Sequence, residues 1–435
     1  MTRGPVRRHS RTTASALVSV LLFASCSGGG ARETLPFEDS VGVAAAADDA
    51  EDVSDSGGQI ESIPEMSSVP DDTVDTSSPV LDDVDESPGQ GGTASLECVA
   101  QRPLEVRLGQ VLMVFAYGES LDPVVEAARR WELGGAILMR WPDGADPARI
   151  VDLAGAASIP LHLAVDEEGG DVQRLRSFGR LASQREVVAT MDVAAAEEMI
   201  TAHASELARF GITMVFAPVV DVSPIPGPDS APDTMRSRAF SADPDVVAEY
   251  TDAYVQAWSS AGIIPVLKHF PGHGSAAADT HEAAASTPPL PELMARDLIP
   301  YQRIDQRDQI GVMTGHLDVP GLTDDEGLPA SLSSAAVTGL LRDELGFGDA
   351  IVVTDALNMR AITDRFSTSE AALLALNAGS DIILYASVEE TEAIVSRLSD
   401  ALETGELSLD RLDDSVERLL RSKGIDPCSF LESVR

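Results

Sequence analysis

The sequence predicts an α/β fold of the (β/α)8 barrel type. From about residue 104 onward, eight short apolar runs alternate with stretches of helical patterning. Runs that are apolar almost throughout are typical of parallel strands buried on both faces. Eight such units in about 330 residues match a closed barrel, and a doubly wound open sheet is the alternative. Because no GxGxxG or Walker pattern follows any run, the sequence predicts no nucleotide cofactor.

The predicted strands and helix ends can be placed along the chain. The eight apolar runs begin at Gln110, Gly135, Leu161, Thr213, Ile263, Gly311, Ala350 and Asp381. Asp122-Pro123 and Asp243-Pro244 each combine a capping side chain with a proline suited to the first helical position. Gly262 and Gly379 stand where helices are expected to end.

Residues 1–26 are predicted to be an export signal. Basic residues precede the apolar run "ALVSVLLFAS", which is too short for a comfortable membrane span. Ala24 and Ser25 before Cys26 resemble a lipobox, so we expect Cys26 to be lipidated. The protein would then be anchored on the extracytoplasmic side of the cell membrane. An ordinary secretory peptide cut nearby is the alternative.

Residues 27–97 are predicted to be a disordered acidic linker before a folded domain at 98–435. Between Ser27 and Glu97 there are 18 acidic residues and one basic residue, Arg32. Such a segment cannot bury enough apolar surface to offset chain entropy. The formal net charge of the whole chain is −40. That charge repels nucleic acid, so we expect no nucleic-acid partner and no membrane contact beyond the anchor.

Two cysteines, Cys98 and Cys428, flank everything that is predicted to fold. Export implies an oxidising compartment, where an even pair is usually bridged. We therefore predict a disulfide that ties the two ends of the domain together. Two unrelated thiols are the alternative.

Charged residues follow several of the predicted strands. Asp166 closes the third, Lys268 and His269 the fifth, and Asp355 the seventh. In a (β/α)8 barrel these strand ends form one face, which holds the active site. Charged groups at one rim therefore predict a shared pocket, and Asp166, Lys268 and His269, together with Arg174, suit a substrate rich in hydroxyls.

The residues also suggest chemical roles. Asp355 follows a buried strand, so its carboxylate is held rigidly and could attack an electrophilic carbon. His281 lies in "HGSAAADTHEAAAS", a loop rich in glycine and alanine, and an imidazole exchanges protons near neutral pH. Asp279, two residues earlier, could orient that ring. His316 is expected behind the site, His273 in a structural role, and Glu167 and Glu168 in the turn after Asp166.

Four motifs stand out between about Leu108 and Ala386: "KHFPGHG" with "DTH", "DEEGGDVQR", "SRAFSADP" and the aspartate of "VVTDALNM". Together they resemble glycoside hydrolase family 3, and most of all its single-domain β-N-acetylglucosaminidases. The resemblance implies that Asp355 is the nucleophile and that His281, paired with Asp279, is the general acid/base. It also implies a (β/α)8 barrel and a sugar held by Asp166, Arg174, Arg238, Lys268 and His269.

The resemblance predicts a retaining exo-β-N-acetylglucosaminidase that works through a covalent glycosyl-aspartate. Its substrates would be cell-wall-derived or chitin-like glycans, with no cofactor, and we expect a monomer. A β-glucosidase or a phosphorylase of the same family is the alternative, followed by a sugar-binding lipoprotein without catalysis. A zinc site at His269, His273, Asp279 and His281 is disfavoured because Pro271 and Gly272 prevent helical presentation of the first two.

Overall fold

The computed structural model describes residues 90–429, apart from 143, 224–234, 236, 306, 308–309 and 324–326, with side chains from Ser95 onward. The predicted export signal with Cys26, and residues 27–89 of the predicted linker, lie outside the described residues. The predicted boundary at residue 98 falls inside helix α1 (Gln90–Ala100). Residues 90–97, the last part of the predicted linker, carry a single charge, Glu97, and the same helix continues to the fully buried Val99.

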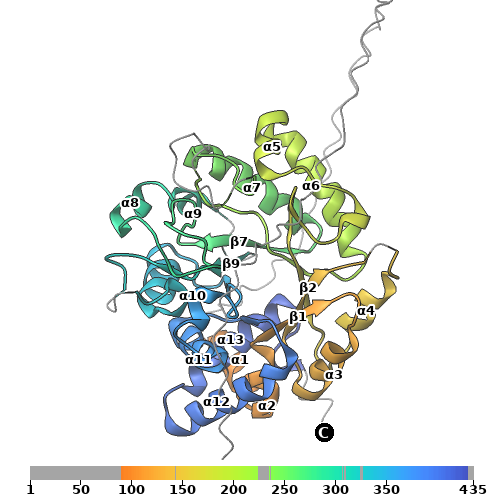
Figure 1. Ribbon diagram of the computed structural model, residues 1–435. Helices are drawn as coiled ribbons and strands as arrows, with labels where there is room; N and C mark the ends of the chain where they lie inside the picture. Colours follow the sequence, from red (N-terminus) through yellow and green to blue (C-terminus); the bar gives the residue numbers. More distant parts are fainter. Residues whose placement is uncertain are drawn as a thin grey trace, which may run out of the picture. The chain divides into compact units, whose positions relative to one another are not determined.

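Eight parallel strands form the centre of the domain (Figure 1). They are β1 (Leu112–Tyr117), β2 (Gly135–Arg140), β3 (His162–Val165), β6 (Met214–Val215), β7 (Ile264–Phe270), β9 (Gly311–Thr314), β11 (Ile351–Thr354) and β12 (Ile383–Tyr385). Their order is β11-β9-β7-β6-β3-β2-β1-β12. A parallel bridge between Val353 and Ile382 joins the two end strands. The predicted barrel is therefore confirmed, and the open sheet is excluded.

Helices surround these strands, as Figure 1 shows. They are α2 (Leu104–Gln110), α3 (Asp122–Trp131), α4 (Ala148–Ala154), α5 (Gln184–Thr190), α6 (Val193–Ala208), α7 (Pro244–Ser260), α8 (Leu290–Ala295), α9 (Ile299–Arg303), the π-helical η3 (Ala335–Glu344), α10 (Arg360–Thr363), α11 (Thr368–Ala378), α12 (Thr391–Thr404) and α13 (Leu409–Ser422). Three short 3₁₀ turns are η1 (Arg176–Phe178), η2 (Ala330–Leu332) and η4 (Val388–Glu390).

Two small sheets lie outside the barrel. Strands β4 (Glu167–Gly169) and β5 (Val172–Gln173) form an antiparallel hairpin directly after β3. Strands β8 (Ala285–Ser286) and β10 (Leu317–Asp318) pair in parallel beyond the ends of β7 and β9. Both small sheets therefore lie on the side where the barrel strands end.

The helix ends follow the local chemistry of the sequence. Asp243 caps α7 by accepting from the backbone N–H of Asp245, and Pro244 is the first helical residue, as predicted. The prediction at Asp122 is wrong by one residue, because α3 begins at Asp122 itself and Leu121 is the cap. Gly379 ends α11 with a φ of 122°, a conformation that favours glycine.

A disulfide joins the two cysteines that flank the barrel. Cys98 in α1 is bonded to Cys428, with their Cα atoms 5.1 Å apart. The bond spans 330 residues of sequence, so it ties the first described helix to the end of the described chain. Among the described helices, none combines the length and apolar character that a bilayer crossing requires.

Candidate active site

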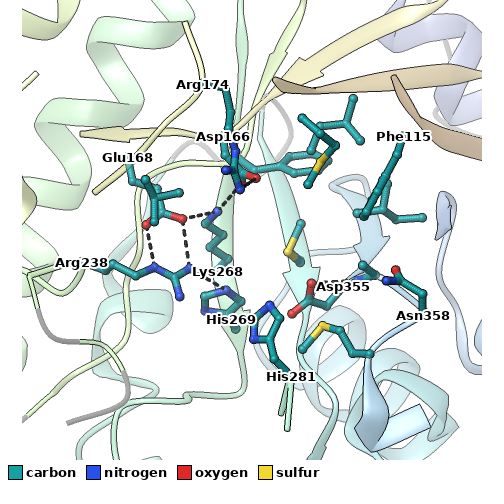
Figure 2. Close-up of a pocket in the computed structure, with 18 residues that line it drawn as sticks. Phe115, Asp166, Glu168, Arg174, Arg238, Lys268, His269, His281, Asp355 and Asn358 are labelled. Carbon is teal, nitrogen blue, oxygen red and sulfur yellow. Dashed lines mark hydrogen bonds and ion pairs between the residues drawn. The ribbon is translucent and has the colours of Figure 1, made fainter. Parts of the chain in front are cut away.

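The carboxyl ends of the barrel strands surround a pocket of about 310 Å³ (Figure 2). That volume is at the small end of ligand sites and suits a single sugar unit. The wall combines an apolar side with a charged side. The apolar side is formed by Phe115, Ile137, Met139, Val172, Phe216, Met313, Ala356, Met359 and Leu384. The charged side is formed by Asp166, Glu168, Arg174, Arg238, Lys268, His269, His281 and Asp355, together with the neutral amide of Asn358. Such a wall can pack against one face of a ring and bind hydroxyls at its edge.

Lys268 anchors the charged side of the pocket. Its Nζ lies 2.7 Å from Oδ1 of Asp166 and 2.5 Å from Oε1 of Glu168. Arg174 reaches the other oxygen of Asp166, with Nη2 3.4 Å from Oδ2. Burial alone would raise the pKa of Asp166, but the charges of Lys268 and Arg174 outweigh it and lower that pKa. Asp166 therefore stays ionised and can accept hydrogen bonds from sugar hydroxyls.

Glu168 also pairs with Arg238 in a fork of two bonds, from Nε to Oε2 at 2.8 Å and from Nη2 to Oε1 at 3.0 Å. Burial opposes the charge of Glu168, but Arg238 and Lys268 outweigh it and lower its pKa to about 2. The Glu168 carboxylate is almost fully buried. It therefore sets the positions of two cations that the pocket presents to a ligand.

His269 is held from two sides. Its Nδ1 lies 2.7 Å from Oδ2 of Asp221, and its Nε2 lies 3.4 Å from Nη2 of Arg238. Asp221 is buried, and although burial opposes its charge, His269 and His273 lower its pKa. The ionised Asp221 accepts a hydrogen bond from Nδ1 of His269 and so fixes the ring with Nε2 toward Arg238.

Asp355 lies directly after β11 and is half-buried at the pocket. Its Oδ1 accepts from the backbone N–H of Ala356 at 2.7 Å. Burial alone would raise the pKa of Asp355, but the nearby rings of His269 and His316 and the N–H of Ala356 outweigh it and lower that pKa. The carboxylate is therefore ionised at neutral pH and available to attack a carbon.

Asp279 and His281 form a pair on the loop after β7. Oδ1 of Asp279 accepts both from Nδ1 of His281 at 2.8 Å and from its backbone N–H at 2.9 Å. Burial opposes the charge of Asp279, but these bonds outweigh it and lower its pKa. The His281 ring is directed toward the pocket, on the side of Asp355, as Figure 2 shows. An imidazole and a carboxylate therefore face the same small space.

The structure gathers most of the predicted site residues around one pocket. Asp166, Arg174, Arg238, Lys268, His269, His281 and Asp355 line it, and Asp279 is bonded to His281. His316 lies behind the site, with Nδ1 2.8 Å from Oγ of Ser331 and Nε2 3.1 Å from the carbonyl oxygen of Ala356.

Sequence reasoning did not identify Glu168 and Asp221 as residues of the site. Their neighbour Glu167 shapes the turn, as predicted, because its Oε1 accepts from the backbone N–H of Leu175. Glu168 does not only shape the turn, because alternation along the strand β4 directs it into the pocket. Asp221 follows the apolar run "FAPVV", and its place after a strand was the signal that could have revealed it.

The residues of the zinc alternative, which the sequence disfavours, make other contacts. Nδ1 of His269 is bonded to Asp221, and Nε2 of His273 lies 3.1 Å from Oγ1 of Thr280. Within the described ranges, no group of three or more histidine, cysteine, aspartate or glutamate residues is arranged to hold a metal ion.

Residues 104–422 match the family model described as the glycosyl hydrolase family 3 N terminal domain. The chain is 45% identical over 283 residues to "Beta-hexosaminidase LpqI" of Mycobacterium tuberculosis (strain ATCC 25618 / H37Rv). The aligned region covers 63% of this chain and 71% of that protein.

Solved structures of the same family are also similar to this chain. The structure of M. tuberculosis LpqI superposes with a TM-score of 0.68 at 38% identity, covering 76% of this chain and 96% of that one. A glycoside hydrolase family 3 β-N-acetylglucosaminidase from Paenibacillus sp. str. FPU-7 superposes with a TM-score of 0.69 at 33% identity, covering 74% of this chain and 62% of that one.

Proposed function

Since the chain belongs to glycosyl hydrolase family 3, and is therefore a glycoside hydrolase, we propose that it removes terminal N-acetylglucosamine from glycans with retention of configuration. The observation that carries the proposal is the pairing of an ionised Asp355 with the Asp279–His281 dyad at a pocket with room for one sugar. The choice of N-acetylglucosamine as the sugar rests on its relatives, which include a β-hexosaminidase and a β-N-acetylglucosaminidase.

The proposed reaction has two steps. In the first, the carboxylate of Asp355 attacks the anomeric carbon while His281 gives a proton to the departing glycosidic oxygen. This forms a covalent glycosyl-aspartate. In the second, His281 takes a proton from water, which attacks the same carbon and releases Asp355. Asp279 orients the His281 ring through the bond to Nδ1.

The proposed substrate site is the charged side of the pocket. Asp166 and His269 offer acceptors to sugar hydroxyls, and Arg174, Arg238 and Lys268 offer donors. Because the pocket has room for about one sugar, it favours the end of a glycan chain over an internal unit. We propose cell-wall-derived or chitin-like glycans as the natural source of that end.

The substrate proposal is tested by aryl β-glycosides of N-acetylglucosamine and of glucose, each with and without inorganic phosphate. We expect turnover of the N-acetylglucosamine compound in either buffer, with free sugar as the product. Preference for the glucoside would identify a β-glucosidase instead. Formation of a sugar phosphate would identify a phosphorylase, and absence of turnover on any glycoside would favour a non-catalytic sugar-binding protein.

Asp355→Ala is predicted to abolish turnover without loss of the fold, because the covalent intermediate can no longer form. We expect kcat to fall by at least about 10³-fold. Circular dichroism should show an unchanged spectrum. A folded variant with near-normal kcat would contradict the assignment of the nucleophile.

His281→Ala is predicted to slow poor leaving groups far more than good ones. A dinitrophenyl group departs without a proton, whereas a phenyl group benefits from an acid, which typically contributes about 10²–10⁴-fold. Azide needs no base, so it should partly rescue the second step and give a β-glycosyl azide. Equal losses on both substrates without azide rescue would place the proton donor elsewhere.

We also propose that the protein is exported and lipid-anchored through Cys26, and that it acts as a monomer. The basic start, the apolar run and the small residues before Cys26 support the anchor. Metabolic labelling with a fatty-acid analogue tests it, because label should be incorporated by the natural chain and not by Cys26→Ala.

A further inference from the structure

Thr280, the middle residue of the "DTH" triplet, is buried, whereas its two neighbours are exposed to solvent. The side chains of Asp279 and His281 are 43% and 64% exposed, whereas Thr280 is only 1% exposed. In the described part of the chain, the hydrogen bonds of Asp279 and His281 are all made within residues 279–283. These bonds join the two residues to each other but do not join them to the barrel.

Thr280 provides that connection through two bonds. Its Oγ1 lies 3.1 Å from Nε2 of His273. Its carbonyl oxygen accepts from the backbone N–H of Ala361 at 3.3 Å. Ala361 lies in α10, the helix that follows Asp355 and its turn. A single buried threonine therefore links the exposed dyad to two separate parts of the site.

His273 is itself firmly placed. It is 3% exposed, and its backbone N–H donates to Oδ1 of Asp221 at 2.6 Å. The other oxygen of Asp221 accepts from Nδ1 of His269 at 2.7 Å. A chain of hydrogen bonds thus runs from His269 in the pocket, through Asp221 and His273, to Thr280 beside the dyad.

We propose that Thr280 is a positioning residue, and that its bond to His273 holds the Asp279–His281 dyad in a fixed place relative to the sugar-binding His269. The inference rests on the proposed role of His281 as general acid/base. Proton transfer needs the donor within hydrogen-bond reach of the glycosidic oxygen, and a displacement of about 1 Å can cost about 10²-fold in rate. The hydrogen-bond chain through Asp221 therefore fixes the distance between the proton donor His281 and the sugar-binding His269.

The two substitutions Thr280→Val and Thr280→Ser separate this role from simple packing. Valine keeps the shape of threonine but cannot bond to His273, whereas serine keeps the hydroxyl and loses a methyl group. The measurement is kcat/KM on N-acetylglucosamine glycosides with a dinitrophenyl and with a phenyl leaving group. Thr251→Val is the matched control, because Thr251 is buried in α7 and its hydroxyl has no partner among the described residues.

For Thr280→Val we expect a loss of at least about tenfold with the phenyl leaving group and of less than about threefold with the dinitrophenyl group. The pH profile with the phenyl compound should also change, because the proton-transfer step becomes limiting. Thr280→Ser should recover most of the loss. Thr251→Val should change neither substrate.

Two outcomes would overturn the proposal: no loss with Thr280→Val, or equal losses on both leaving groups in a variant that melts like the natural protein. If Thr280→Val fails to fold, His273→Gln tests the same bond from its other end, and the same difference between leaving groups is expected. His281→Ala serves as the reference. If that variant shows no leaving-group dependence, the proposed role of His281 fails, independently of what the Thr280 variants show.

Discussion

Glu168 positions two other side chains of the pocket, although its own carboxylate is buried. Its carboxylate is buried and contacts Lys268 and Arg238, both of which line the pocket. Two cations so close together would repel each other and move apart without an anion between them. The side chain therefore fixes the donors of the site as well as balancing their charge.

Glu168→Gln is predicted to weaken both binding and stability, because the two buried cations lose their shared counter-charge. We expect kcat/KM to fall by at least about tenfold and the free energy of unfolding by about 3 kcal/mol. Glu198→Gln, at an exposed position of α6, is the matched control and should change neither quantity.

The pH dependence of stability provides a second measurement on the same variant. The pKa of Glu168 is lowered in the folded state to about 2, below its ordinary value of 4.5. Its contribution to stability is therefore complete above pH 4.5 and is lost as the pH falls from there toward 2. Urea unfolding of the natural protein should show this loss, and Glu168→Gln should show a smaller one. Identical pH profiles would contradict the assigned ion pairs.

Sequence reasoning found the residues at strand ends and missed those that act through them. Asp355, Lys268 and His269 could be placed because a charge at the end of an apolar run is unusual. Asp221 also follows an apolar run, but its partners lie about 50 residues further along the chain. Only the folding of the chain brings Asp221 next to these partners, so the hydrogen-bond chain from His269 to Thr280 could not be predicted from the sequence.

At the scale of elements, the apolar runs predicted the strands well but not their ends. The run that begins at Thr213 forms only Met214–Val215 as a regular strand. Pro218 interrupts it, because proline has no N–H to donate to a neighbouring strand. The run that begins at Gly311 divides into β9 and β10, which belong to two different sheets.

At the scale of elements too, a buried ion cluster connects strands at the start of β12. Asp381 is fully buried, and its oxygens lie 2.7 Å from Nη2 of Arg342 and 2.8 Å from Nη1 of Arg418. The same carboxylate accepts from the backbone N–H of Val352 in β11 at 2.9 Å. Burial opposes the charge, but Arg342 and Arg418 outweigh it and lower the pKa of Asp381. The cluster therefore joins the last strand of the barrel to its neighbour.

Asp381→Asn is predicted to destabilise the fold without impairing the chemistry. The neighbouring arginines would lose their buried counter-charge, at a cost of about 3–5 kcal/mol. The cluster lies at the amino ends of the strands, opposite the pocket, so kcat of the folded protein should be unchanged. Urea unfolding measures the first effect, and Glu392→Gln, which breaks an exposed pair with Arg130, is the control. A variant as stable as the natural protein would contradict the role of this cluster.

At the scale of the whole molecule, the two ends of the described chain are joined. Helix α1 packs against α13, Val99 is fully buried, and the disulfide links Cys98 to Cys428. Nη2 of Arg102 also donates to the carbonyl oxygen of Pro427 at 3.0 Å. The helix before the barrel is thus part of the folded domain, although the acidic composition of residues 27–97 as a whole predicted otherwise.

Two shortened chains are predicted to behave differently for this reason. A chain that begins at Gln90 keeps α1 and the disulfide, so it should match the full chain in Tm and kcat/KM. A chain that begins at Leu104 loses both and leaves Cys428 unpaired. By chain entropy the closed loop contributes up to about 6 kcal/mol, and the packing of α1 against α13 adds to it. We therefore expect the shorter chain to have a Tm about 5–10 °C lower. A reductant supplies the decisive comparison: it should lower the Tm of the chain from Gln90 and leave that of the chain from Leu104 unchanged. Equal Tm values for the two chains, or no response to reductant in the longer one, would mean that α1 and its disulfide do not stabilise the barrel.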